Sequence, residues 1–388
     1  MKKIRIAQII TRMDWGGSPD IVRLLCQGLD PEKFDITLVI GRSAHISQTN
    51  QQFLEQFKNR TRYIPQLQRE INPLKDLAAL IKIYNILHTG KFDLVQTHTA
   101  KAGILGRLAA RLAGVKKIVH WSHGHNFYGY FGFWGSKLVI TIERFFDRFS
   151  DKFIALTELE KSDLINYRVT SAKKVVVVQS GLEIEKYQSS QEGIKKLKEE
   201  WRLPATARVV GMVGRLEPVK GPLLMVEAAK IVAAACPDVI FLVIGEGSLR
   251  KKMEEQCRTA NLTGNFVFAG WREHVEQLLG VLDILVLPSL NEAVGRIILE
   301  AAAYGVPVVA TRVGGVPEIV RDQETGLLVP AQDAGSMARA LVELLTDREK
   351  REHLGQAAKE KVTTRFTARE MVRSINNLYL DLVPDENN

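Results

Sequence analysis

The sequence predicts an α/β protein made of two Rossmann-like, doubly wound parallel-sheet domains. The chain has 388 residues, a length that suits two domains better than one. Short apolar, β-branched runs alternate with helical patterns, as in parallel sheets covered by helices on both faces, and this alternation restarts after residue 191. Open α/β sheets bind ligands at the carboxyl ends of their strands. We therefore expect the functional site in a cleft between the two domains.

In the first domain, residues 1–182, runs rich in Ile, Val, Leu and Phe predict strands. Residues 21–29, 77–88 and 101–114 have helical periodicity and lie between such runs. The predicted strands cover residues 4–10, 34–40, 92–97, 117–121, 152–156 and 175–178. Strand and helix therefore alternate, which favours a parallel sheet.

The second domain, residues 183–366, follows a glycine turn and a polar, charged segment at 180–191. Further apolar runs predict its strands, with helical stretches between them. These runs cover residues 207–214, 239–245, 266–271, 283–288, 306–311 and 326–330. The segment 367–388 contains a last helix, for which packing back on the first domain is one alternative.

Composition and charge narrow the functional classes. No apolar run is long enough to span a membrane, no signal-peptide cleavage site follows the start, and the three cysteines form no CxxC pair. We therefore expect a cytoplasmic protein. Lys and Arg outnumber Asp and Glu by 27 to 15 up to Ser180, whereas the remainder has 26 against 29. The basic first half suits an anionic membrane, such as the inner face of the cytoplasmic membrane, or a phosphorylated acceptor, and no nucleic-acid-binding module is recognisable.

Common cofactor and metal motifs are missing from the sequence. Without GxGxxG or GxxxxGK[ST], a dehydrogenase or a P-loop kinase is disfavoured. DxD and HExxH are also absent, although scattered acidic residues leave Mg²⁺ as an alternative. We expect neither a cofactor nor a required metal.

The most informative segment, "NEAVGRIILEAAAYG", has carboxylates at Glu292 and Glu300 around an apolar run. If this segment is mostly helical, the two carboxylates are roughly 12 Å apart along the axis, which matches the span from a sugar to a ribose across a diphosphate. Small residues up to Gly295 lead into the start of the helix, and the free N–H groups there suit a diphosphate. The structural alternative is that Glu292 caps the helix and Glu300 pairs with Arg296 at i−4. The segment alone leaves both interpretations open.

A second unit, "VGRLEPVKG", directly follows a predicted strand. Arg215 and Lys220 lie on a turn built from Gly214, Pro218 and Gly221, so both cations can reach a leaving phosphate in the cleft. The alternative is a solvated surface turn. Two cations facing a candidate anion-binding helix favour the functional interpretation.

The first domain offers weaker candidates. Gly16 and Gly17, between a strand and a helix, permit close approach of a phosphate or an acceptor, although a plain turn also favours glycine. His123 and His125 follow a strand, where an imidazole can donate a hydrogen bond to a sugar hydroxyl or to the reacting oxygen. A structural histidine is the alternative.

An aromatic run, "FYGYFGFW", lies beside Lys137 in the basic half. Its rings suit a lipid-linked acceptor or the membrane interface. A loop folded on its own aromatic side chains is the alternative. The aromatic residues are Phe127, Tyr128, Tyr130, Phe131, Phe133 and Trp134.

Across nearly its whole length the sequence resembles the retaining GT-B glycosyltransferases of the family-4 type, often called glycosyl transferases group 1. The most specific segments are, in the family's order, "GRLEPVKG", "VIGEGSLRKKME", "VFAGW", "PSLNEAVGRIILEAAAYGVPVVATRVGGVPEIV" and "TGLLVP". The N-terminal "GGSPDIV" and "THTAKAGILGRLAARLAG", followed by "HGH", are similar to bacterial members that build surface polysaccharides.

The resemblance implies roles for the candidate residues. Arg215 and Lys220 would hold the nucleotide diphosphate, and Glu300 would accept hydrogen bonds from the ribose hydroxyls. Glu292 and His123 would contact the donor sugar. The other donor-binding positions would be Ala293, Val294 and Gly295 at the sugar and phosphate, Gly17 at the phosphates, and Gly245, Gly247, Trp271 and Arg272 at the base. Gly16 and Gly214 would also belong to the donor site. Many relatives read EGFG where this chain reads EAVG at 292–295, a departure that bears on sugar choice more than on mechanism.

The resemblance further implies the activity. A hexose would pass from a nucleotide sugar, with UDP the expected nucleotide, to a lipid-linked or saccharide acceptor in envelope polysaccharide synthesis. Configuration would be retained, and a metal is usually not required. Two alternatives remain at this point: a nucleotide-sugar 2-epimerase on a similar scaffold, and a non-catalytic nucleotide-binding protein.

Overall fold

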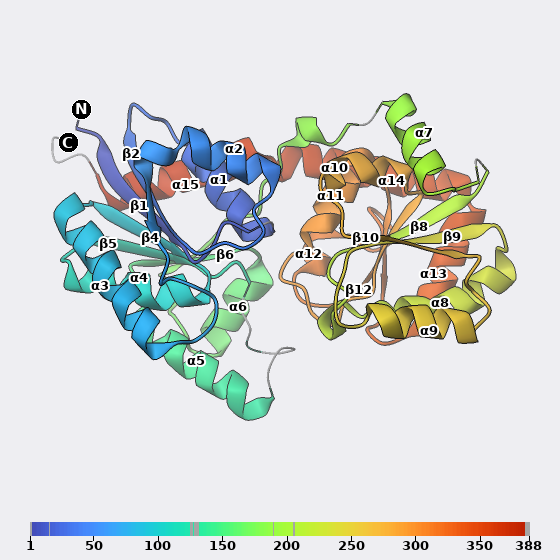
Figure 1. Cartoon of the computed structure of the whole chain (residues 1–388), viewed down its shortest axis with the longest axis horizontal. Coiled ribbons are helices and arrows are strands. Elements are labelled where there is room, and N and C mark those ends of the chain that lie inside the picture. Colours follow the sequence, from blue (N-terminus) through green and yellow to red (C-terminus); the bar gives the residue numbers. More distant parts are fainter. Residues whose placement is uncertain are drawn as a thin grey trace. The chain divides into compact units, whose positions relative to one another are not determined.

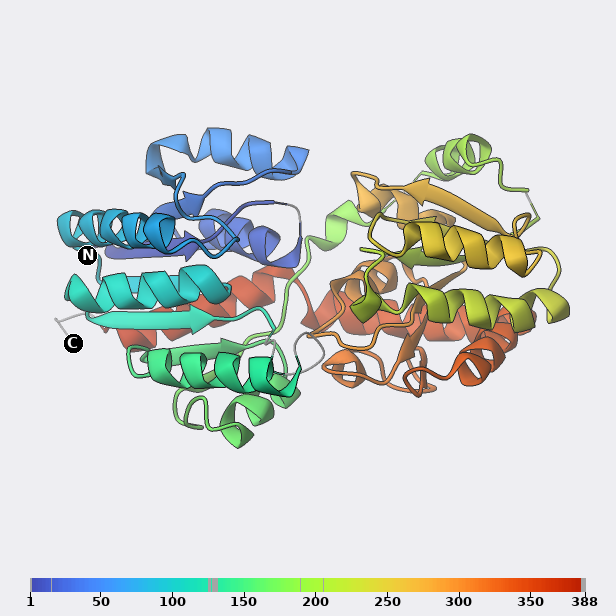
Figure 2. The same cartoon turned by 60° about the horizontal axis from the view of Figure 1, so that its bottom comes forward.

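The structure, a computed structural model, describes residues 2–14, 16–124, 127, 132–188, 190–204 and 206–384. The chain forms two compact units: unit 1 comprises Met1–Gly181 with Ala368–Asn388, and unit 2 comprises Leu182–Thr367. Each unit has one parallel sheet with helices on both faces (Figure 1, Figure 2). The predicted fold class, two Rossmann-like parallel-sheet domains, is confirmed.

Unit 1 has a seven-stranded sheet in the order β3-β2-β1-β4-β5-β6-β7. The order reverses between β1 and β4, which makes this pair the switch point. β3 was not predicted, because it is a four-residue edge strand with an exposed centre and no apolar run. The strands are β1 (Ile4–Ile10), β2 (Phe34–Gly41), β3 (Thr61–Ile64), β4 (Leu94–His98), β5 (Lys117–Trp121), β6 (Lys152–Ala155) and β7 (Val175–Val177).

The helices of unit 1 begin at recognisable signals. For α3, the Asn72 side chain accepts a hydrogen bond from the Lys75 N–H at 3.1 Å, and Pro73 takes the first helical position. The helices are α1 (Gly17–Gly28), α2 (Gln48–Gln56), α3 (Pro73–Gly90), α4 (Ala100–Leu112), α5 (Phe133–Asp147), α6 (Glu158–Asn166) and α15 (Ala368–Leu382).

The C-terminal helix α15 belongs to unit 1 although it follows unit 2 in the sequence. It packs beside α1, where a Cβ added to Gly28 would lie 2.9 Å from a Val372 methyl group. Its Tyr379 ring contacts Phe34 of β2 edge to face, with centroids 5.9 Å apart. The absence of a side chain at Gly28 therefore lets the last helix approach α1.

Unit 2 has a six-stranded sheet in the order β10-β9-β8-β11-β12-β13. Its switch point lies between β8 and β11, which pair in parallel. The near-continuously buried strands account for their apolar sequences. They are β8 (Arg208–Val213), β9 (Val239–Ile244), β10 (Phe266–Gly270), β11 (Ile284–Leu287), β12 (Val308–Thr311) and β13 (Leu327–Val329).

The helices of unit 2 complete its core. Buried side chains of α8 and α13, such as Val226 and Leu341, share one apolar cluster with β8, β9 and β11. Burying each such side chain contributes about 1.5–3 kcal/mol. The helices are α7 (Gln191–Glu200), α8 (Pro222–Ala235), α9 (Arg250–Thr259), α10 (Val275–Leu278), α11 (Arg296–Tyr304), α12 (Val316–Ile319), α13 (Ala334–Thr346) and α14 (Arg348–Arg365).

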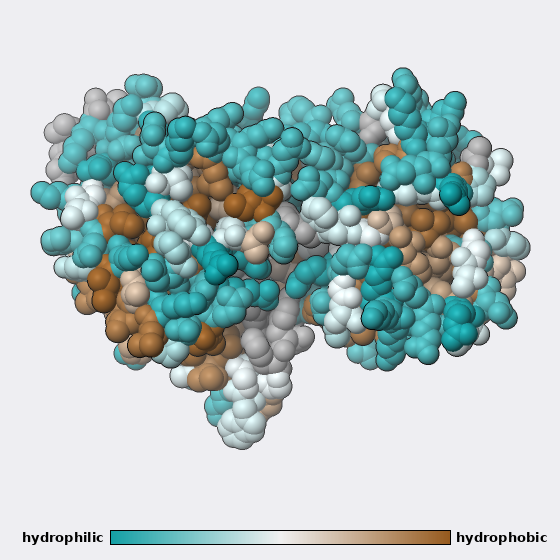
Figure 3. Space-filling model, viewed as in Figure 1, coloured by the Kyte–Doolittle hydropathy of each residue, from teal (hydrophilic) through white to brown (hydrophobic). Residues whose placement is uncertain are grey.

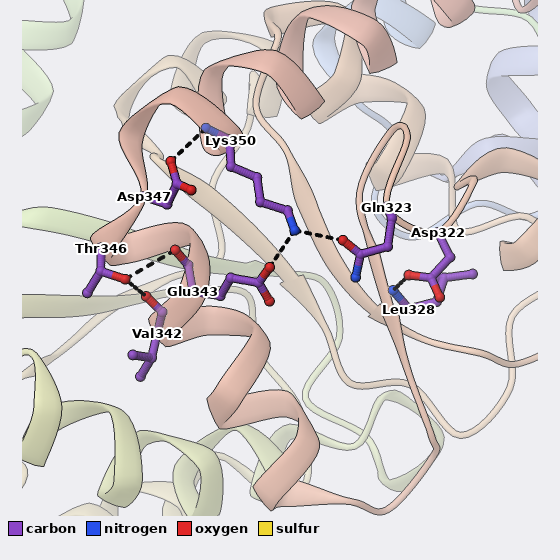
Figure 4. A network of polar contacts seen from close by, with 8 residues as sticks. All are labelled: Asp322, Gln323, Leu328, Val342, Glu343, Thr346, Asp347 and Lys350. Carbon is purple, nitrogen blue, oxygen red and sulfur yellow. Dashed lines mark hydrogen bonds and ion pairs between the residues drawn. The ribbon is translucent and has the colours of Figure 1, made fainter.

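A polar network ties α13 and α14 to the turn before β13 (Figure 4). Lys350 Nζ donates to Glu343 Oε1 at 2.5 Å and to Gln323 Oε1 at 2.7 Å. No predicted site residue takes part in the bonds drawn there, so the network is structural. Among the described residues, no helix combines the length and the apolar character needed to cross a bilayer.

Candidate functional site

Several candidate residues of unit 2, including Arg215, Lys220 and Glu292, lie at its switch point, on the loops that follow β8 and β11. The Leu290 N–H donates to the Val219 carbonyl at 2.8 Å, which joins the two loops. Gly221, at φ 62°, lies so close to the second loop that an added Cβ would be 2.1 Å from the Pro288 carbonyl oxygen. The two loops are therefore in direct backbone contact at the sheet edge where α/β proteins bind ligands.

Lys220 and Glu292 form an ion pair between these loops. Lys220 Nζ lies 2.5 Å from Glu292 Oε1, and the Ser289 hydroxyl donates to the same oxygen at 2.8 Å. The Glu292 side chain is 8% exposed and that of Lys220 is 24% exposed. The structural alternative proposed that Glu292 caps α11, and this cap is not formed. Lys220 keeps enough solvent access to exchange its partner for an anionic ligand.

Arg215 differs from Lys220 in its surroundings. Arg215 is exposed to solvent. Its positive charge acts on the neighbouring carboxylate of Glu217. Hydrogen bonds from the Ser248 hydroxyl and N–H, together with the positive charge of Arg215, lower the pKa of Glu217. The two predicted cations therefore lie on one loop, one held in an ion pair and the other open to solvent.

The start of α11 follows Glu292 closely. Ala293, Val294 and Gly295 form the turn into the helix, and Gly295, at φ 68°, is its N-terminal cap residue. The Glu292 carbonyl accepts a hydrogen bond from the Gly315 N–H at 3.0 Å, which fixes this turn against the loop after β12. The first N–H groups of a helix lack intrahelical acceptors and attract anions. The arrangement can chemically accommodate a negatively charged group beside Lys220.

Glu300, one turn into α11, pairs with Arg296. Arg296 Nε lies 3.0 Å from Glu300 Oε1, and the two side chains are 18% and 15% exposed. The ion pair at i−4, left open as an alternative by the sequence, is therefore present. It explains how the carboxylate is accommodated among apolar neighbours, and a ribose contact stays a prediction.

The loop glycines of unit 2 have structural reasons for their identity. Gly245, at φ 142°, would place a Cβ 1.9 Å from the Gly214 carbonyl oxygen, and a Cβ on Gly247 would be 2.5 Å from the Leu216 carbonyl oxygen. The Gly245 N–H also donates to Gly270 at 2.8 Å. Backbone packing between the loops after β8, β9 and β10 thus requires glycine, which the sequence did not reveal.

The remaining predicted residues of unit 2 lie on the loop after β10. Trp271 is exposed, and Arg272 pairs with Glu200 at the end of α7, with 3.0 Å between Nη2 and Oε1.

In unit 1, Gly16 and His123 lie beyond the carboxyl ends of β1 and β5. Gly16, at φ 147°, precedes α1, whose first residue is Gly17, and a Cβ on Gly16 would meet no atom within 4 Å. His123 has a φ of 58°, stacks on Trp121 with centroids 4.9 Å apart, and approaches His98 Nδ1 with its Nε2 at 2.8 Å. Burial lowers the pKa of His123 to about 3, so the imidazole is neutral. His125 lies outside the described residues.

The aromatic run divides into buried and exposed parts. Phe127 is buried and contacts Tyr167 edge to face, whereas Phe133 and Trp134 at the start of α5 are 75% and 76% exposed. Lys137 Nζ lies 5.6 Å from the centroid of the Trp134 ring. The other members of the run, Tyr128, Tyr130 and Phe131, lie outside the described residues.

Sequence reasoning missed several polar residues near these sites. Ser289 supports Glu292, while Gln8, His98 and Tyr379 form a buried network behind His123. The sequence did contain one sign of this network, because a glutamine within an apolar strand needs buried hydrogen-bond partners. Within the described parts of the chain, no cluster of three or more His, Cys, Asp or Glu residues is placed to hold a metal ion.

Comparisons with known proteins find matches over most of the chain. The chain matches the family models "Glycosyl transferases group 1" over residues 193–361 and "Glycosyltransferase Family 4" over residues 15–186. It is 33% identical over 367 residues to the UDP-Gal:alpha-D-GlcNAc-diphosphoundecaprenol alpha-1,3-galactosyltransferase of Escherichia coli, covering 92% of this chain and 91% of the relative. The capsular polysaccharide biosynthesis glycosyltransferase CapM of Staphylococcus aureus is 25% identical, over 86% of this chain and 89% of its own.

Solved structures share the fold. The crystal structure of Anabaena HepE in complex with UDP-glucose has a TM-score of 0.82 at 22% identity and covers 97% of this chain and 100% of that one. The sucrose-phosphate synthase of Thermosynechococcus elongatus has a TM-score of 0.80 at 22% identity and covers 98% and 99%. Both proteins therefore have a fold similar to that of this chain.

Proposed function

The chain belongs to the glycosyl transferases group 1 family, and we propose that this glycosyltransferase moves a hexose from a UDP-sugar to a saccharide acceptor carried on a lipid diphosphate. The Escherichia coli relative uses UDP-Gal and an acceptor on diphosphoundecaprenol, and the structure of Anabaena HepE holds UDP-glucose. The place of the reaction would be envelope polysaccharide synthesis, as for the Staphylococcus aureus relative.

The observation that carries this proposal is the meeting of Lys220, Glu292 and the start of α11 at the switch point of unit 2. The diphosphate of the donor would displace Glu292 as the partner of Lys220 and would accept hydrogen bonds from the N–H groups of residues 293–295. Arg215, open to solvent on the same loop, would add a second positive charge. As the sugar leaves, negative charge grows on the diphosphate, and fixed cations stabilise it.

The other donor contacts follow from this placement. Released from Lys220, Glu292 would accept hydrogen bonds from sugar hydroxyls, and Glu300 would do the same for the ribose. The base would lie on the loops of Gly245 and Trp271. The sugar would be transferred on the face from which the diphosphate leaves, so that configuration is retained, and charge stabilisation by the protein would make a metal unnecessary. Activity that survives EDTA would support a reaction without a metal. NMR of the product shows whether the anomeric configuration is retained, as proposed, or inverted.

Nucleotide-dependent stabilisation tests the donor site. UDP should raise the melting temperature of the wild-type protein, and Lys220→Ala and Arg215→Ala should abolish the shift, because both remove positive charge from the diphosphate site. Lys230→Ala, an exposed lysine on α8, is the matched control and should keep the full shift. Absence of any response to UDP or GDP, together with no hydrolysis of a panel of nucleotide sugars, would refute the proposal.

A lipid-linked acceptor implies contact with a membrane, for which unit 1 has a suitable surface. Exposed apolar side chains lie on one face of α3 and of α5, and hydrophobic surface gathers over these helices (Figure 3). Arg148 and Lys137 lie beside exposed rings of the α5 face. Apolar side chains with cations at their margin fit the interface of an anionic membrane. The exposed apolar residues are Leu74, Leu77, Ile81, Phe133, Trp134, Leu138 and Phe145.

Vesicle flotation tests this surface. The protein should float with vesicles containing phosphatidylglycerol, less with pure phosphatidylcholine, and Trp134→Ser combined with Leu77→Ser should reduce flotation, because both remove apolar area from the surface. Trp271→Ser, which removes an exposed tryptophan of unit 2, is the control. Equal flotation of the double variant and the wild type would show that membranes bind elsewhere.

A further inference from the structure

Unit 1 contains a buried path of hydrogen-bonded polar side chains that extends from its last helix, α15, to His123. Gln8 of β1 and Gln96 of β4 are fully buried and face each other in the strand register at the switch point. His98 is two residues beyond Gln96 and therefore lies on the same face of the sheet. Buried polar side chains destabilise a fold unless they are hydrogen-bonded, so the placement of these three in apolar strands needs an explanation.

The hydroxyl of Tyr379 closes one end of this path. It accepts a hydrogen bond from Gln8 Nε2 at 2.8 Å and donates to Gln96 Oε1 at 2.6 Å. His98 Nε2 lies 2.7 Å from Gln8 Oε1, and His98 Nδ1 lies 2.8 Å from His123 Nε2. The amide nitrogen of Gln96 is farther from His98 Nε2, at 3.4 Å. The short contacts thus form one continuous path from α15 to His123.

The path defines where the protons lie. Gln8 Oε1 can only accept, so His98 must carry its proton on Nε2. Burial lowers the pKa of His98 well below its usual value, which keeps the ring neutral and leaves its Nδ1 as an acceptor. His123 must then donate from Nε2.

The remaining nitrogen of His123, Nδ1, is consequently a lone-pair acceptor. It is buried and has no hydrogen-bond partner within the parts of the chain that the structure describes. A buried acceptor of this kind calls for a partner from a ligand. Stacking on Trp121 holds the ring in place.

We propose that Tyr379, Gln8 and His98 are positioning residues that fix the Nε2–H tautomer of His123, so that His123 Nδ1 accepts a hydrogen bond from a hydroxyl group of a sugar substrate. The identity of this ligand rests on the proposed function. The tautomer itself does not, because every bond that sets it is present without a ligand. The C-terminal helix thereby supplies the first member of a hydrogen-bonded path that ends at His123.

The tautomer is measured directly in the ligand-free enzyme. In ¹⁵N-histidine spectra, with the His123 signals assigned by their loss in His123→Asn, Nδ1 should show the shift of an unprotonated nitrogen and Nε2 that of a protonated one. The reverse pattern at His123 would overturn the proposal, because the amides would then be turned the other way. This result is independent of any donor.

Kinetics test the path. Tyr379→Phe keeps the ring but removes the hydroxyl, so it should lower kcat/KM for hydrolysis of the UDP-sugar about fivefold to tenfold. UDP affinity should stay unchanged, because UDP lacks the hexose whose hydroxyl would contact His123. In a His123→Ala background the same substitution should change kcat/KM less than about twofold. Ile375→Val, which loosens the same helix without touching the path, controls for packing.

The outcomes separate the two proposals. An equal loss from Tyr379→Phe with and without His123, or a loss of UDP affinity, would overturn the positioning role. A wild-type enzyme that hydrolyses no nucleotide sugar would refute the proposed function, while the histidine spectra would still decide whether the tautomer is fixed.

Discussion

The two units place different kinds of polar group at their switch points. In unit 1 the groups behind the candidate site, Gln8, His98 and Tyr379, are buried and hydrogen-bonded to one another. In unit 2 the groups are charged, Lys220 with Glu292, and lie on loops with partial access to solvent. The same sheet topology thus supports a neutral, enclosed network in unit 1 and a charged, partly buried pair in unit 2.

The difference indicates what each unit can do. Breaking a buried hydrogen bond leaves donors and acceptors unsatisfied, at a cost of about 1–3 kcal/mol for each group, so the network of unit 1 keeps one arrangement. The Lys220–Glu292 pair is partly buried, so Lys220 can change partners only where a ligand anion replaces the carboxylate and other donors, such as the Ser289 hydroxyl, keep Glu292 hydrogen-bonded. Unit 1 is suited to hold a fixed hydrogen-bonding direction, and unit 2 to bind and release an anion.

The largest expected effect is from the loss of Lys220. Lys220→Met should slow UDP-sugar hydrolysis by roughly 100-fold, or about 2.7 kcal/mol of activation free energy, because the charge that develops on the diphosphate loses a fixed cation. Steady-state kinetics measure it, with Lys230→Met as the control. A loss below about threefold would show that Lys220 serves only its ion pair with Glu292.

Glu292→Gln should separate binding from turnover. Without the carboxylate, Lys220 has no anion to exchange, so UDP should bind about fivefold more tightly, whereas turnover should fall about tenfold because an amide accepts sugar hydroxyls more weakly. Calorimetry with UDP and donor hydrolysis measure the two effects. Glu227→Gln, an exposed residue of α8, is the control. Weaker UDP binding would contradict the exchange of partners.

The sequence predicted the sheets and the loop positions but not the contacts made there. Apolar runs determine buried strands, and "EAVG" and "GRLEPVKG" mark the loops at the unit 2 switch point. Whether Glu300 faces a ligand or Arg296 is decided by side-chain rotamers, which spacing does not encode. The link between Tyr379 and Gln8 spans 371 residues, so no local pattern contains it. β3 escaped prediction because edge strands need no apolar run.

A smaller effect is expected at Glu300. Glu300→Gln should weaken UDP binding about fivefold if this carboxylate accepts hydrogen bonds from ribose hydroxyls. Arg296→Gln breaks the same ion pair but keeps the carboxylate, so it should leave UDP affinity nearly unchanged and shift only the melting temperature. Calorimetric titration of both variants measures the difference. Equal UDP affinities in the two variants and the wild type would assign Glu300 to the ion pair alone.

The smallest expected effect is a difference between the units in acid. Burial lowers the pKa values of His98, His120 and His123 in unit 1, and the positive charge of Arg107 adds to the effect at His120. The unfolded chain therefore binds more protons than the folded one below pH 6.5, so unit 1 loses stability as pH falls from 6.5 towards 3. In unit 2, burial lowers the pKa of Lys361 to about 8, so the contribution of Lys361 to the stability of unit 2 changes only above that pH.

Hydrogen exchange, corrected for intrinsic rates, should thus show β1 and β4 losing protection between pH 7.5 and 5.5 while β8 and β11 keep theirs. Equal losses in both units would mean that the buried histidines of unit 1 do not set its acid sensitivity.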